Sequence, residues 1–160
     1  MRIKSITFSR WGSSDQDFSG IRLTNKSGQS SELMGTKRHD EETAEIKELP
    51  IARIQIFEKN DAYMRGFRIH YRNGDTTLIN SDTGIDKGAI EFEETDILVG
   101  LTCLCTAPND LKPRGFGFTV MRRQNGNYVY HQTKILGNSI SNYTETWPPI
   151  STLQNRQDVA

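Results

Sequence analysis

The stretch GFRIHYRNG at residues 66–74 begins with a glycine, alternates apolar with polar side chains, and ends on a second glycine. Apolar side chains at every second position predict a half-buried β-strand. The pattern occurs upstream as GIRL at residues 20–23 and, in a looser form, downstream as GFGF at residues 115–118. Since self-similarity at a period of roughly 20–50 residues is typical of repeated supersecondary units, the sequence predicts three copies of one β unit.

Each copy also has a second alternating segment upstream of its glycine, at residues 3–8, 51–57 and 97–105. The joining segments match too, since residues 45–51 and 90–97 each have the pattern of a strand, a short acidic turn and the next strand. The Asn-Gly pairs at residues 73–74 and 125–126 predict tight hairpin turns. Both central positions of such a turn need a positive φ, which these residues tolerate.

One such sheet cannot bury its own apolar face, whereas three sheets packed around a common axis can. We therefore expect an all-β fold, a three-fold pseudo-symmetric β-prism of three four-stranded antiparallel sheets. A two-sheet sandwich or an open barrel stays as an alternative. The one segment with a helical pattern, residues 37–47, is too charged to form an apolar face. The prism is expected to span residues 1–137, followed by a C-terminal extension at residues 138–160.

The composition excludes several classes of partner. With 20 basic and 20 acidic side chains, the chain offers no strong field for a phosphate backbone, so no nucleic acid is expected. No apolar run reaches membrane-spanning length, so no membrane insertion is expected. Residues 1–11 have no secretory signal pattern, which favours a cytoplasmic or cytoskeletal location. Cys103 and Cys105 share one face of a strand and are interpreted as small buried hydrophobes rather than metal ligands.

The order and spacing of the motifs over residues 3–121 resemble the jacalin-type β-prism lectins. This resemblance implies a non-catalytic module that binds carbohydrate at one end of the prism. It also implies a site made from a glycine-rich N-terminal loop and a Gly-x-x-x-Asp loop in the last copy. The glycine-rich segment has no counterpart before residue 3, and Thr106 stands where the glycine of the last loop is expected.

From that family's sugar site only Asp110 is carried over, with Asn109 as its neighbour. A carboxylate accepts hydrogen bonds from sugar hydroxyls, although an Asn-Asp pair also forms ordinary turns, and both interpretations stay open. The corresponding loops of the other two copies hold further aromatic and carboxylate candidates, which are Trp11, Asp15, Asp17, Asp61 and Tyr63. Ordinary polar turns have the same composition.

No catalytic residue, cofactor or metal site is predicted, because no nucleophile, base or phosphate-binding loop occurs at a usable spacing. The alternative function is a docking subunit of a larger intracellular protein assembly in which the sugar site has been lost. This alternative depends on the C-terminal extension, where Tyr143, Trp147 and Ile150 could anchor a protein partner. The same segment could instead fold back on its own domain.

Overall fold

A computed structural model describes residues 2–14, 16–59, 63–107, 112–137 and 143–153. Within these ranges the chain is built from β-strands and one short helix, which confirms the predicted all-β class. In chain order the elements are β1 (Ile3–Arg10), β2 (Phe18–Asn25), β3 (Met34–Gly35), β4 (Glu41–Glu45), β5 (Ile51–Lys59), β6 (Tyr63–Tyr71), β7 (Thr76–Asn80), β8 (Ile85–Glu91), β9 (Ile97–Cys105), β10 (Gly115–Gln124), β11 (Asn127–Gln132), β12 (Leu136–Gly137), β13 (Tyr143–Trp147) and α1 (Ile150–Leu153). The helix is too short to cross a membrane.

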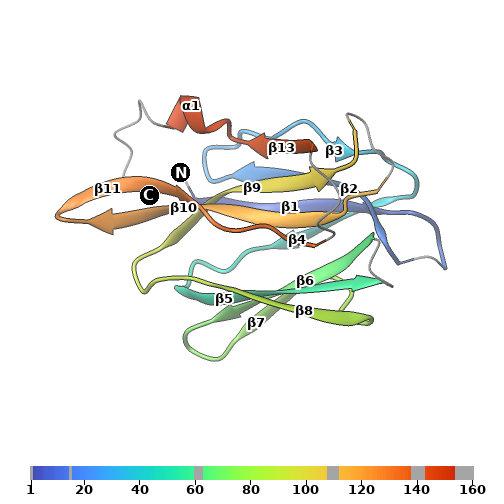
Figure 1. The fold of residues 1–160 in the computed structure, drawn as a ribbon, viewed down its shortest axis with the longest axis horizontal. Helices are drawn as coiled ribbons and strands as arrows, with labels where there is room; N and C mark the ends of the chain where they lie inside the picture. The colour runs from blue at the N-terminus through green and yellow to red at the C-terminus, as the bar shows by residue number, and fades with distance from the viewer. Residues whose placement is uncertain (1, 15, 60–62, 108–111, 138–142, 154–160) are drawn as a thin grey trace.

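The strands form three antiparallel sheets (Figure 1). Their orders are β3-β2-β1-β4, β7-β6-β5-β8 and β11-β10-β9-β13, and β12 also pairs with β10. In every sheet a central hairpin is flanked by the next strand on one side and by a returning strand on the other. This is the Greek-key order, which covers both edges of the central hairpin.

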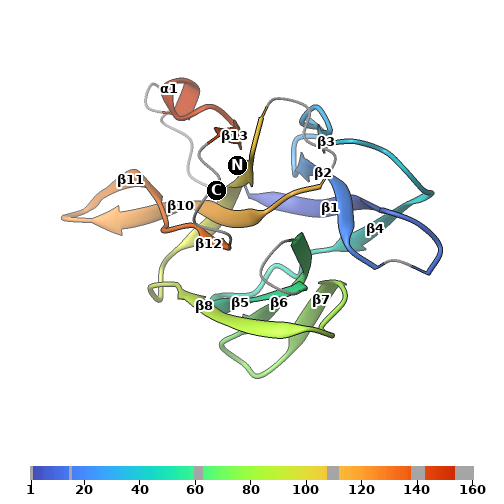
Figure 2. The same ribbon diagram turned by 45° about the vertical axis from the view of Figure 1, so that its right-hand side comes forward.

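The three sheets share one hydrophobic core. Phe18 in β2, Phe67 in β6 and Phe116 in β10 have no exposed surface, and their ring centroids lie 5.3–6.1 Å apart. Ile21 is buried in the same core, which confirms the prediction that the strands led by Gly20, Gly66 and Gly115 face a shared interior. β2 contacts both β6 and β9, strands of the other two sheets. In Figure 2 the sheet of β5, β6, β7 and β8 lies below the other two.

The lead glycines lie where an outer strand passes very close to the backbone of the central hairpin. Gly66 pairs with Asn80, and a Cβ atom at position 66 would come within 2.6 Å of the Ile79 carbonyl oxygen. Asn80 has a φ of 69°. The equivalent partners of Gly20 and Gly115 also have positive φ, and they are Gly35 and Gly137. A left-handed residue in the outer strand thus accompanies each lead glycine.

The hairpin prediction for residues 125–126 is confirmed, because Asn125 and Gly126 both have positive φ between β10 and β11. For residues 73–74 it is wrong in one respect, since only the glycine has positive φ. There the Tyr71 amide donates to the carbonyl of Asp75, and the loop between them has three residues. A three-residue loop needs one left-handed residue at its end rather than two in its centre.

The described part of the C-terminal segment folds back on its own domain. β13 pairs with β9 over its whole length, from Tyr143 opposite Cys105 to Trp147 opposite Leu101. Both aromatic side chains pack against the core, and Leu153 in α1 is buried. A strand after the predicted boundary at residue 137 therefore completes the sheet of β9 and β10.

Replacing Gly66 by alanine should lower the free energy of unfolding by about 2–3 kcal/mol, because the added methyl group would overlap the backbone of residues 79–81. Chemical denaturation followed by circular dichroism measures this. Gly12 is the matched control, because a Cβ atom there meets no atom within 4 Å, and Gly12→Ala should stay within about 1 kcal/mol of wild type. Equal midpoints for both variants would contradict the packing of β7 on β6.

Candidate functional site

The described residues that flank the connections of the three central hairpins lie close together at one end of the molecule. Trp11 follows β1, Tyr63 begins β6, and Lys112 precedes β10. The Lys112 ammonium lies 4.5 Å from the ring centroid of Trp11 and 4.5 Å from that of Tyr63. The amide of Met64 donates to the carbonyl of Pro113, which joins the second connection to the third. One side chain from each sheet thus contributes to a single cluster.

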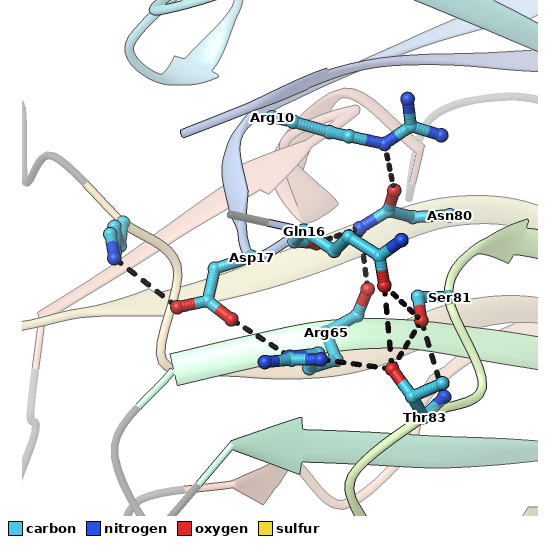
Figure 3. A network of polar contacts seen from close by, with 8 residues as sticks. Arg10, Gln16, Asp17, Arg65, Asn80, Ser81 and Thr83 are labelled. Atoms are coloured by element: carbon cyan, nitrogen blue, oxygen red, sulfur yellow. Dashed lines mark hydrogen bonds and ion pairs between the residues drawn. The ribbon is translucent and has the colours of Figure 1, made fainter. Parts of the chain in front are cut away.

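A buried carboxylate pairs with the Lys112 ammonium. Asp17, just before β2, has no exposed surface. Its Oδ1 accepts a hydrogen bond from Arg65 Nε at 3.1 Å, and its Oδ2 accepts one from Lys112 Nζ at 3.2 Å (Figure 3). Because an unpaired buried carboxylate is costly, these two cations make its burial possible. Asp17, in the hairpin of the first sheet, thus links Arg65 of the second sheet to Lys112 of the third.

Two more cations contact the aromatic rings. The Arg38 guanidinium carbon lies 4.4 Å from the Trp11 ring centroid, and that of Arg114 lies 4.7 Å from the Tyr63 centroid. Each ring therefore contacts two cations, and each such contact contributes on the order of 0.5–2 kcal/mol. We call this group the loop-end cluster, and its members are Trp11, Asp17, Arg38, Tyr63, Arg65, Lys112 and Arg114.

A network of polar side chains holds Arg65 in place (Figure 3). Arg65 Nη1 donates to the Thr83 hydroxyl at 2.9 Å, while its carbonyl accepts from the Asn80 side-chain amide at 2.6 Å. The same amide donates to the carbonyl of Gln16, and the Asn80 side-chain oxygen accepts from Arg10 Nε at 2.7 Å. These bonds join the first sheet to the second and fix the guanidinium that faces Asp17.

The sequence located part of this cluster. Trp11, Asp17 and Tyr63 were candidates, and the structure brings them together around Lys112. The other candidates lie outside the described residues, and they are Asp15, Asp61, Asn109 and Asp110. Sequence reasoning missed Arg65 and Lys112. A weak signal was present, because Arg65 and Arg114 occupy the same position, directly before a lead glycine.

The proposed partner anchors have structural contacts of their own. Tyr143 and Trp147 pack against the core from β13, and Ile150 is half-buried at the start of α1. Cys103 and Cys105 are both buried, and their sulfur atoms lie 3.8 Å apart, so they share one face of β9 as predicted. Among the described residues, no group of three or more His, Cys, Asp or Glu side chains is placed to hold a metal ion.

His70 lies on the half-exposed outer face of β6, away from the loop-end cluster. Its Nε2 is 2.9 Å from the side-chain oxygen of Gln55. Partial burial lowers the pKa of His70, and the positive charges of Arg53 and Arg68 lower it further. Both effects favour the neutral form of the imidazole. His70 forms part of the outer surface of its sheet.

A cavity of about 190 Å³ lies at the opposite end, where β1, β5 and β9 begin. Its apolar lining comes from the segments that join one sheet to the next, including Ile46, Leu49 and Ile97. Two of the charged groups at its rim already form ion pairs, Lys47 with Asp75 at 3.3 Å and Asp96 with Arg122 at 2.9 Å. Lys47 and Asp96 therefore link neighbouring elements at this end.

Comparison with models of known protein families finds no match for this chain, and a comparison with curated proteins finds no match either.

Asp17→Asn should destabilise the fold by about 2–4 kcal/mol, because the amide leaves the Arg65 and Lys112 cations without their shared carboxylate. Denaturant titration at neutral pH measures the loss. Asp82→Asn is the control, since Asp82 forms an exposed ion pair with Arg68 and should contribute less than about 1 kcal/mol. A loss at Asp17 no larger than that at Asp82 would show that the buried carboxylate does not hold the loops together.

Proposed function

We propose that the chain is a non-catalytic binding module with the architecture of a three-fold β-prism. Three observations support this architecture: each sheet has the same strand order, each lead glycine faces a left-handed residue, and one phenylalanine ring from each sheet enters the core. In such an arrangement the three hairpin connections converge, so that a ligand site can draw on all of them.

We further propose that the loop-end cluster binds carbohydrate. The observation that carries this proposal is the convergence of Trp11 and Tyr63, from two different sheets, on the Lys112 ammonium, which is itself paired with Asp17. Aromatic faces suit the apolar faces of sugar rings, and carboxylate oxygens accept hydrogen bonds from hydroxyl groups. Both rings are only half-buried, so their remaining surface is available to a ligand.

One ground for the alternative, a docking subunit of a larger assembly, was the order of the C-terminal segment. Pairing of β13 with β9 and burial of Leu153 order residues 143–153 without any partner. That segment therefore no longer favours the assembly hypothesis over the carbohydrate hypothesis.

Trp11 provides a direct test, because the chain has two tryptophans and Trp147→Phe leaves Trp11 as the only one. In this background, titration with a panel of neutral, amino and acidic oligosaccharides should give a saturable change in tryptophan emission for at least one of them. Tyr63→Leu should weaken that binding roughly 3- to 10-fold, as expected for the loss of one stacked ring. Isothermal calorimetry on the wild-type chain checks the affinity.

The control for that titration is Tyr128→Leu, which removes an exposed tyrosine from β11, outside the loop-end cluster. Its affinity should equal that of the parent. Absence of any emission change and of any calorimetric heat across the whole panel would refute the carbohydrate proposal.

A further inference from the structure

Lys112 fills the space that a ligand would use. Its ammonium lies between the rings of Trp11 and Tyr63 and within 3.2 Å of the Asp17 carboxylate. Only 12% of its side chain is exposed. Two aromatic rings and a carboxylate around one ammonium form a cation site, because ring faces and carboxylate oxygens both carry negative potential.

This arrangement limits which sugars can enter. A neutral sugar that stacks between the rings would have to displace Lys112 and would break its ion pair with Asp17 Oδ2. Hydroxyl donors would replace that cation only in part, because hydrogen bonds to a charged partner are stronger than neutral ones.

A ligand that carries its own ammonium avoids this penalty. Its charge would take the position of the Lys112 ammonium, renew the ion pair with Asp17 and restore the contacts with both rings. The lysine would then move into solvent, where its flexible side chain is readily hydrated. Binding becomes an exchange of one ammonium for another, in which the buried carboxylate never loses a cation.

We propose that the loop-end cluster selects sugars with a protonated amine, and that Lys112 occupies the amine position until such a sugar binds. This inference rests on the carbohydrate function proposed above, and it specifies the substrate class for that site. Arg65 stays bound to Asp17 Oδ1 in both states, so the exchange involves only the second carboxylate oxygen.

The test compares two ligands, the β-1,4-linked trimer of glucosamine and its fully N-acetylated form. They differ only in the substituent on the nitrogen of each sugar residue. Acetylation removes the positive charge and leaves the sugar rings unchanged. The glucosamine trimer should bind the wild-type chain at least about tenfold more tightly than the acetylated trimer, as expected for an added charge-assisted contact. Calorimetry and Trp11 emission in the Trp147→Phe background measure both affinities.

Variants of the lysine separate the cation site from general attraction between charges. Lys112→Ala removes the competing ammonium and should tighten binding of the glucosamine trimer, again by about tenfold or more. Lys47→Ala is the matched control, because it also deletes a lysine paired with an aspartate, on the surface at 3.3 Å from Asp75. It should leave the affinity unchanged. Thermal melts of both variants verify that they are folded.

The outcomes distinguish the two proposals. Equal binding of both trimers, or tighter binding of the acetylated one, would overturn the amine preference and leave carbohydrate binding in place. Weaker binding of the glucosamine trimer by folded Lys112→Ala would also overturn it, because the lysine would then be a ligand contact rather than a competitor. Failure of every sugar in the wider panel to bind either chain would remove the carbohydrate function itself.

Discussion

The rings of Phe18, Phe67 and Phe116 come from three different sheets and meet in the middle of the core. Each pair contributes about 0.5–1.5 kcal/mol beyond the burial of its surface. The contact also requires all three sheets to be present, because each sheet has an apolar face that only the other two sheets can cover. A single sheet of four strands would leave that face in water, so the three sheets must fold as one unit.

Packing the sheets in this way forces their hairpin connections together at one end, and it brings polar groups into a crowded space. The buried carboxylate of Asp17 is the clearest consequence. Its attraction to Arg65 and Lys112 is worth a few kcal/mol each at an effective dielectric constant of about 20, while burial of the charges costs several kcal/mol. The two terms nearly cancel. The cluster therefore fixes how the three connections meet more than it adds to stability.

The central hairpins could be predicted from sequence because their pattern is local: alternate apolar side chains, and a glycine where an outer strand crosses. The returning strands were indicated only in part, by the joining segments at residues 45–51 and 90–97. β4 lies within residues 37–47, the one segment with a helical pattern. Most of its side chains are polar and exposed, so no apolar alternation indicates a strand there. β13 follows a polar stretch, and its pairing depends on the open edge of β9, which is about 40 residues away in the chain.

The loop-end cluster divides in the same way. Aromatic side chains and carboxylates in loops are conspicuous, so Trp11, Asp17 and Tyr63 could be chosen from composition alone. Nothing in the local sequence distinguishes Lys112 from other loop lysines. Its contacts with Trp11 and Tyr63 arise only because the fold brings residues of the three hairpins together. The local sequence therefore predicts that Trp11, Asp17 and Tyr63 could contact a ligand. It does not predict that the Lys112 ammonium already contacts all three.

In the proposed site, that occupancy would couple ligand binding to the fold. Lys112 belongs to the connection of the third sheet, Tyr63 to the second and Asp17 to the first, so any ligand that separates the lysine from the carboxylate weakens a link among all three. A ligand stabilises a protein only by the surplus of its binding energy over the native contacts that it replaces. For this site the surplus is small unless the ligand supplies a cation of its own, because the displaced contact is an ion pair at a buried carboxylate. The ion pair of Lys112 with Asp17, which holds the loops together, would therefore also determine which ligands bind in the proposed site.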